Sequence, residues 1–298
     1  MKKLLIILFF LPAFAFSQEI IQLYPGKNKD YRKNSVTLTV YKSENCDGTG
    51  LILCPGGSYC YLGTKYEGQK PAQLFSSKGI TCFILNYRTG MKGNRNPAMT
   101  EDIQTAILYI RQHAHKYGIT NLGTCGFSAG GHLSGCAAEF YNNPVIKIDS
   151  SLDHKILRPD FSVCIYPVIT MAENCCHKRS RRNLLGENKN NKEMQNKLSL
   201  EKNVRSDMPP IFIVQCKDDP VVDYHNALLL DSALTEADVR HKLILFDNGG
   251  HGFGISPERI KSDNKSAGLW WKEFLIWHKE QPEIEDPDRH KDNEEITK

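Results

Sequence analysis

The sequence lacks several features that would assign it to whole classes of protein. Its leading apolar run, Leu4 to Phe14, holds 11 residues, whereas a membrane-spanning helix needs about 20. Charge is nearly balanced, with 38 Lys and Arg against 34 Asp and Glu, so nothing favours a nucleic acid partner. No internal repeat is present, which argues against a solenoid or a propeller. We therefore expect a globular chain with no membrane span once a leader is removed.

The sequence also lacks a metal-binding motif with the usual spacing of its ligands. Cys175-Cys176-His177 has no second ligand pair at zinc spacing, so we expect no metal, and nothing else in the chain calls for a cofactor. The ten cysteines leave their disulfide pairing open. Five of them fall in predicted buried strands, where a free thiol packs as a small apolar group: Cys54, Cys82, Cys125, Cys164 and Cys216.

The order of the chain predicts three parts. Residues 1–17 read as a signal peptide, with a basic start, an apolar stretch and small residues before Gln18; the protein is then secreted or periplasmic. Residues 18–279 form one catalytic domain, a length that suits a single large core. Residues 280–298 are charged, lack a core pattern and read as a disordered tail.

A strand-turn-helix pattern surrounds Gly126-Phe127-Ser128-Ala129-Gly130. A short apolar stretch precedes it, and small helix-compatible residues follow it. This is the context of a nucleophile elbow, in which a tight turn exposes the serine and glycines avoid a clash. Ser128 is therefore the candidate nucleophile.

A serine needs a base, and the base needs a carboxylate to hold one tautomer. His251 lies on a glycine-rich loop after the predicted strand 242–246, where it can reach a neighbouring strand end. Asp218, Asp219 and Asp223 all follow the strand 210–216. Asp219 is chosen because Pro220 keeps it extended, with Asp218 in reserve, and Asp223 is expected to cap the next helix.

The expected oxyanion hole combines two loops. One donor is the backbone N–H of Ala129, directly after the nucleophile. The other comes from the turn 55–59, which follows the predicted strand 50–54 and contains two glycines. Elsewhere, strands alternate with helices from residue 50 onward, which predicts an α/β fold with a mostly parallel sheet covered by helices on both faces.

Residues 172–208 interrupt that alternation and read as a small cap-like insertion. Its basic cluster, 177–182, could face an acidic sugar, but a solvated loop is the preferred interpretation. Glu67 could orient the oxyanion loop or contact the substrate, but an acidic residue near a helix start is the preferred interpretation. Asp102 is likewise interpreted as a helix-start residue and Arg88 as a brace between loops. Trp270 is expected to pack in the core.

The chain resembles the α/β-hydrolase superfamily of esterases and lipases, close to secreted acetylxylan-type carbohydrate esterases and BD-FAE-like feruloyl-esterase proteins. The resemblance covers most of residues 50–280, including the turn 54–59, the elbow with His132, and His251-Gly252-Phe253. It implies the α/β-hydrolase fold and a triad of Ser128, Asp219 and His251. It also implies Gly57 or Ser58, together with Ala129, as oxyanion donors.

These features predict a serine carboxylester hydrolase that deacetylates plant polysaccharides or oligosaccharides without a cofactor. The partner would be a small-molecule or polysaccharide ester, and the oligomeric state stays open. Tyr59 and Tyr61 are expected to narrow the acyl pocket. The alternatives are an arylformamidase-type or peptidase-type hydrolase on the same fold and, far below them, a non-catalytic binding protein.

Overall fold

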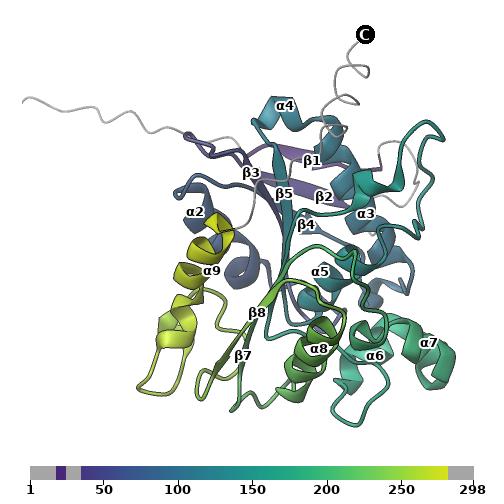
Figure 1. Ribbon diagram of the computed structural model, residues 1–298, viewed down its shortest axis with the longest axis vertical. Helices are drawn as coiled ribbons and strands as arrows, with labels where there is room; N and C mark the ends of the chain where they lie inside the picture. The colour runs from purple at the N-terminus through teal and green to yellow at the C-terminus, as the bar shows by residue number, and fades with distance from the viewer. Residues whose placement is uncertain (1–17, 25–34, 281–298) are drawn as a thin grey trace, which may run out of the picture.

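A single sheet organises the protein. The computed structural model describes residues 18–24 and 35–280, and within them eight strands pair in the order β1-β2-β4-β3-β5-β6-β7-β8 (Figure 1). The strands are β1 (Ile20–Gln22), β2 (Thr37–Tyr41), β3 (Thr49–Cys54), β4 (Thr81–Asn86), β5 (Asn121–Phe127), β6 (Ser162–Ile165), β7 (Ile211–Cys216) and β8 (His241–Phe246). The β1–β2 and β2–β4 pairs are antiparallel and the others parallel, which confirms the predicted mostly parallel sheet.

The strand order changes direction around β3. The chain first adds β4 on one side of β3 and later adds β5 on the other side. In a parallel sheet, the loops at the carboxyl ends diverge at such a switch point and leave a crevice between them. The predicted oxyanion loop follows β3 and Ser128 follows β5, so the topology alone brings the two to one edge of the sheet.

Helices cover both faces of the sheet (Figure 1). Strand β3 shows why, because its side chains alternate between the faces and both sets are apolar. Leu51 and Leu53 pack in one cluster with Phe274, whereas Ile52 packs in another with Ile103. The helices α2 (Lys70–Ser76) and α9 (Trp270–Lys279) cover the first face, and α3 (Ala98–Gln112), α5 (Ala129–Glu139) and α8 (His225–Glu236) the second. Each buried aliphatic side chain contributes about 1.5–3 kcal/mol.

Helix α9 packs in the core and also contacts the loop after His251. Trp270 is fully buried, as predicted, and its indole N–H donates to the carbonyl of Gly254 at 2.7 Å. The apolar face of α9 therefore also holds the loop that follows His251.

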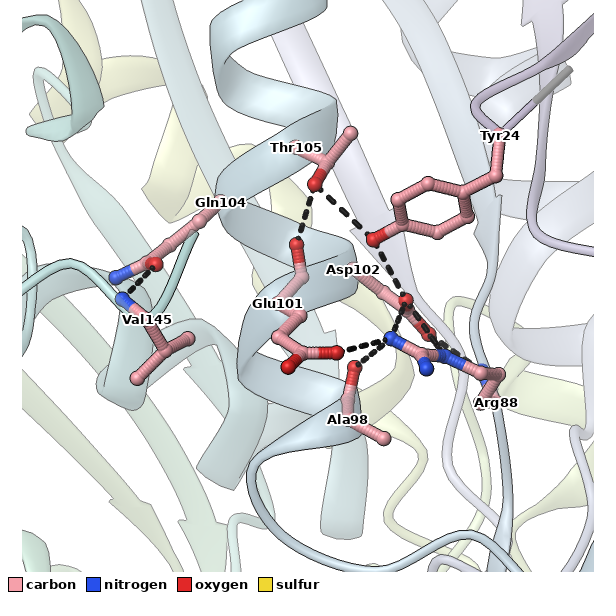
Figure 2. Close-up of polar contacts among 8 residues, drawn as sticks. All are labelled: Tyr24, Arg88, Ala98, Glu101, Asp102, Gln104, Thr105 and Val145. Atoms are coloured by element: carbon pink, nitrogen blue, oxygen red, sulfur yellow. Dashed lines mark hydrogen bonds and ion pairs between the residues drawn. The ribbon is translucent and has the colours of Figure 1, made fainter. Parts of the chain in front are cut away.

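Arg88 follows β4 and is held by acceptors on α3 (Figure 2). Its Nη2 lies 2.7 Å from both Asp102 Oδ1 and Glu101 Oε2, so Arg88 is a brace, but it joins the end of β4 to α3 rather than two loops. Tyr24 OH also donates to Asp102. The expectation that Asp102 opens the helix is wrong: α3 begins at Ala98, and a fully buried carboxylate one turn later requires a cationic partner.

The predicted insertion, 172–208, contains the short helices α6 (Lys178–Leu185) and α7 (Lys192–Lys197). It packs against the loop after β3, because Asn183 Nδ2 donates to the carbonyl of Ser58 at 2.9 Å. Lys178, Arg179 and Arg182 are exposed, which agrees with a solvated basic cluster. Coverage of a bound substrate by this segment stays a prediction.

Several expectations concern the chain ends and the cysteines. The predicted signal peptide, 1–17, and all of the predicted tail beyond Glu280 lie outside the described residues. Across residues 18–24 and 35–280, no helix combines the length and the apolar character that crossing a bilayer requires. The five cysteines predicted in strands are all buried, in agreement with their role as small apolar groups.

Candidate active site

Ser128 lies on a strained turn between β5 and α5. Its backbone has φ 56° and ψ −119°, a conformation that costs a residue with a side chain about 1–3 kcal/mol. A Cβ at Gly126 would lie 1.9 Å from the carbonyl oxygen of Gly130, and one at Gly130 would lie 2.0 Å from that of Cys54. Glycine is therefore required at both positions, as the sequence predicted.

The structure brings the three predicted triad residues together. His251 Nε2 lies 2.9 Å from Ser128 Oγ, and His251 Nδ1 lies 2.7 Å from Asp219 Oδ2. The other oxygen of Asp219 accepts the backbone N–H groups of Val221 and Val222 at 2.8 and 3.0 Å. The fully buried carboxylate is thus fixed on both sides and holds the histidine proton on Nδ1, which leaves Nε2 free to accept the serine proton.

The two competing aspartates have other partners. Asp218 Oδ1 accepts the N–H groups of Gly249 and Gly250 at 2.9 and 2.8 Å, so it shapes the loop that carries His251. Asp223 accepts the N–H and the imidazole of His225, the first residue of α8. The expected capping contact is present, although Tyr224 occupies the cap position itself.

The loop after β3 lies against the nucleophile. A Cβ at Gly56 would come within 2.9 Å of Ser128 Cβ. The carbonyl of Gly56 accepts the N–H of Gly63, and the carbonyl of Gly57 accepts the N–H groups of Cys60 and Tyr61. Since C=O and N–H point in opposite directions in a trans peptide, the N–H groups of Gly57 and Ser58 point away from these loop contacts, as oxyanion donors would. Their role stays a prediction.

Ala129 is the first residue of α5. The first four N–H groups of a helix have no partner within it, and the helix dipole places partial positive charge there. The N–H of Ala129 is therefore suited to the predicted role of stabilising an oxyanion beside Ser128.

Glu67 lies in the first turn of a short π-helix, η1 (Lys65–Gln69), so the preferred interpretation gave its position correctly. Its buried carboxylate also accepts the N–H of Gly56 at 2.9 Å and the hydroxyl of Tyr166 at 2.8 Å. The contact with Gly56 agrees with the other interpretation, in which Glu67 orients the oxyanion loop.

Tyr59 does not line an acyl pocket as expected. Its left-handed backbone, with φ 56°, turns the ring into the core, where only 1% of the residue is exposed. The hydroxyl lies 2.7 Å from His132 Nδ1, and His132 Nε2 lies 2.8 Å from the carbonyl of Leu198. Because a carbonyl only accepts, Nε2 carries the proton and Nδ1 accepts from Tyr59. Tyr61, by contrast, is half exposed.

We expect His132 to make stability depend on pH. Burial lowers the pKa of His132 to about 4, while a histidine in an unfolded chain titrates near 6.5. Between these values the unfolded chain binds more protons, so the free energy of unfolding falls as the pH drops, by about 2 kcal/mol between pH 7 and pH 5. Urea unfolding at the two pH values measures this difference. His132→Gln should reduce the pH dependence, and an unchanged slope in that variant would contradict the assignment.

A cavity of about 640 Å³ opens beside Asp219. One wall is the start of the insertion, 174–179, and the other is the loop 217–224 after β7. Burial, and after it the neighbouring His251, lower the pKa of His177, which favours the neutral imidazole at the cavity wall. Among the described residues, no group of three or more His, Cys, Asp or Glu is arranged to hold a metal ion.

Comparisons with known proteins identify the family of the chain. Residues 38–234 match the family described as BD-FAE, and residues 190–281 match the dienelactone hydrolase family. The chain is 32% identical over 244 residues to an acetylxylan esterase from Xylanibacter ruminicola, covering 79% of this chain and 48% of that protein. It is 35% identical over 221 residues to an endo-1,4-beta-xylanase B from Butyrivibrio fibrisolvens, covering 71% and 33%. The chain thus spans half or less of the length of these curated relatives.

Solved structures share the architecture. An acetyl ester-xyloside bifunctional hydrolase from Caldicellulosiruptor lactoaceticus superposes with a TM-score of 0.76 at 28% identity, over 88% of this chain and 96% of that one. A carboxylesterase from Lactobacillus plantarum gives a TM-score of 0.72 at 20% identity, over 89% and 97%, a likeness that concerns the fold alone. With the BD-FAE match covering most of the sheet and the elbow, the chain belongs to the BD-FAE family of α/β-hydrolases.

Proposed function

We propose that this protein is a serine carboxylester hydrolase that removes acetyl groups from plant polysaccharides such as xylan, or from their oligosaccharides. The observation that carries the proposal is the imidazole of His251, held between Ser128 Oγ at 2.9 Å and Asp219 Oδ2 at 2.7 Å. The acetylxylan esterase and the acetyl ester-xyloside hydrolase among the similar proteins support the choice of acyl group and sugar.

The reaction follows from the positions of these groups. His251 Nε2 takes the proton of Ser128 as its Oγ attacks the ester carbonyl. The N–H of Ala129 and that of Gly57 or Ser58 stabilise the negative oxygen of the tetrahedral intermediate. The sugar hydroxyl leaves with the proton from His251. Water, deprotonated by the same imidazole, then attacks the acyl-enzyme, and acetate is released.

The cavity beside Asp219 suits the alcohol side of such an ester. Its walls carry polar and cationic groups, among them His177, Lys178 and Arg179, which can hydrogen-bond sugar hydroxyls. We place the sugar here and the acyl group at the oxyanion loop. Export, with residues 1–17 as the leader, is part of the proposal because the substrates are extracellular polymers.

We expect acetate esters to be hydrolysed much faster than octanoate esters. Ser128 is buried, with 4% of the residue exposed, and the loop after β3, where we place the acyl group, lies directly against it. A long alkyl chain gains about 0.8 kcal/mol per methylene only where apolar surface receives it, so octanoate should gain little at so confined a position. Turnover of para-nitrophenyl acetate, butyrate and octanoate at matched concentration tests this. A preference for octanoate would point to a lipase.

Acid release from a substrate panel separates the remaining alternatives. Acetylated xylan and its oligosaccharides should release acetate, whereas feruloylated arabinoxylan, N-formyl aromatic amides and aminopeptidase substrates should react far more slowly. Fast deformylation or peptide cleavage would favour the arylformamidase-type or peptidase-type alternative. A catalytically inert chain would leave only a binding protein with the hydrolase fold.

A further inference from the structure

One buried carboxylate near the site has no part in the proposed proton transfers. Glu67 is 8% exposed, and its two oxygens serve different parts of the molecule. Oε2 accepts the N–H of Gly56 in the oxyanion loop, while Oε1 accepts the hydroxyl of Tyr166, which follows β6. Both contacts are short, at 2.9 and 2.8 Å.

Tyr166 also contacts the loop that bears His251. Its hydroxyl oxygen accepts the N–H of Gly254 at 3.0 Å, three residues after His251. Its ring centroid lies 4.6 Å from that of His251. Tyr166 is fully buried, so the histidine ring rests on a fixed surface whose polar end is bonded to Glu67.

The segment around Glu67 also touches the histidine loop directly. A Cβ at Gly254 would come within 2.4 Å of the Tyr66 carbonyl, and the Arg259 guanidinium lies 4.0 Å from the Tyr66 ring centroid. Lys70 donates to Ser256 Oγ at 3.2 Å. The π-helix thus contacts both the oxyanion loop and the loop that bears His251, which are about 200 residues apart in the chain.

We propose that Glu67 is a positioning residue, which fixes the oxyanion loop and the His251 loop relative to each other through Gly56 and Tyr166. The inference rests on the proposed esterase function and adds a residue to its machinery. Glu67 contacts no reacting atom in this arrangement and acts through the groups it bonds.

The strength of its hydrogen bonds explains why a carboxylate, that of Glu67, occupies this buried position. Burial raises the pKa of Glu67, so an ionised carboxylate here carries a desolvation cost that an apolar side chain would avoid. The hydrogen bonds from Tyr166 and Gly56 act in the opposite direction, as does His251 when the reaction protonates it. Hydrogen bonds to a charged acceptor are shorter and stronger than neutral ones. An error of about 1 Å in placing catalytic groups can cost about 10²-fold in rate.

The direct test is Glu67→Gln, assayed on para-nitrophenyl acetate. The amide oxygen can still accept the Gly56 N–H, but the NH₂ group faces Tyr166 and leaves the tyrosine proton without an acceptor. We expect kcat to fall about 10- to 100-fold with KM within about threefold, because the oxyanion contacts act in the transition state rather than in substrate binding. Titration of active sites with a phosphonate that labels Ser128 corrects kcat for any unfolded fraction.

A double-mutant cycle tests the connection itself. Tyr166→Phe keeps the ring beside His251 and removes only the hydroxyl. If Glu67 acts through Tyr166, the double variant should lose little more kcat than the worse single variant, because both changes break the same connection. Multiplicative losses would overturn the proposed route through Tyr166.

Glu139→Gln is the matched control. Glu139 is a fully buried carboxylate at the end of α5, and burial likewise raises its pKa. Its substitution should leave kcat within about twofold. If Glu67→Gln lowered only the melting temperature and left kcat per titrated site unchanged, the positioning role would be wrong while the esterase proposal stood. If the wild type and Ser128→Ala were equally inert, the proposed function itself would fail.

Discussion

Replacing Ser128 with alanine is expected to lower kcat on acetate esters by about 10⁴-fold or more while the chain stays folded. The attacking oxygen is removed, and catalysis that remains comes only from binding and the oxyanion contacts. The change also removes just one oxygen from a strained turn, so packing is little affected. Initial rates with para-nitrophenyl acetate, together with a thermal melt, measure both quantities.

Ser134→Ala provides the control for this result. Ser134 lies on α5, the helix that follows Ser128, is fully buried, and hydrogen-bonds Thr124 at 2.8 Å. Its substitution should cost about 1 kcal/mol of stability and leave kcat within about twofold. A Ser128→Ala enzyme that kept substantial esterase activity would remove Ser128 from the mechanism.

The second large effect is expected from Asp219→Asn, at about 10²- to 10⁴-fold in kcat. The asparagine amide would present an N–H to His251 Nδ1, which favours the tautomer with the proton on Nε2. That nitrogen could no longer accept the proton of Ser128. The measurement is kcat at a pH where the wild type is fully active.

Two neighbouring aspartates serve as matched controls. Asp218→Asn keeps an oxygen for the Gly249 and Gly250 N–H groups, and Asp223→Asn changes contacts at the start of α8 and in the cavity wall but none with His251. Both should therefore reduce kcat much less than Asp219→Asn. If Asp218→Asn were the most damaging of the three, the carboxylate partner of His251 would need reassignment.

The nucleophile depends on residues that are close in the sequence, whereas its two partners depend on segments that only the sheet brings together. The nucleophile is a local feature, since Gly126, Ser128 and Gly130 lie within five residues. The carboxylate and the histidine meet only because β7 and β8 are neighbours in the sheet. Each control variant changes a residue of the same type at a different place. A difference in kcat between the test and the control therefore reports the position of the residue in the fold and not its chemical type.

The sequence by itself determined the features that depend on local sterics and periodicity. The elbow glycines could be predicted because no side chain fits where the turn passes the carbonyls of Gly130 and Cys54. The alternation of strands with helices predicted a mostly parallel sheet covered on both faces, and Arg88 was recognised as a brace, although not its partners on α3. Such features follow from interactions between residues that are close in the chain or that repeat with a fixed period.

The tertiary structure alone decided which polar groups meet. Spacing could not choose firmly between Asp218 and Asp219, because the choice depends on which carboxylate faces His251 across two strand ends. Tyr59 was expected beside the substrate, but a left-handed backbone at that residue turns it onto His132. Glu67 was interpreted mainly as a helix-start residue. Its partners, Gly56 and Tyr166, lie on two separate loops, and the sequence does not show that these loops meet at Glu67.

The common physical reason is that a hydrogen bond depends on direction as well as on proximity. Residue type and spacing place a side chain on the correct edge of a sheet, but they leave open which way its oxygen or nitrogen points. That direction is set by loop backbones, by side chains packed from other elements, and by the need of every buried polar group for a partner. In this protein, contacts that set these directions join residues up to 229 positions apart, which only the folded chain brings together.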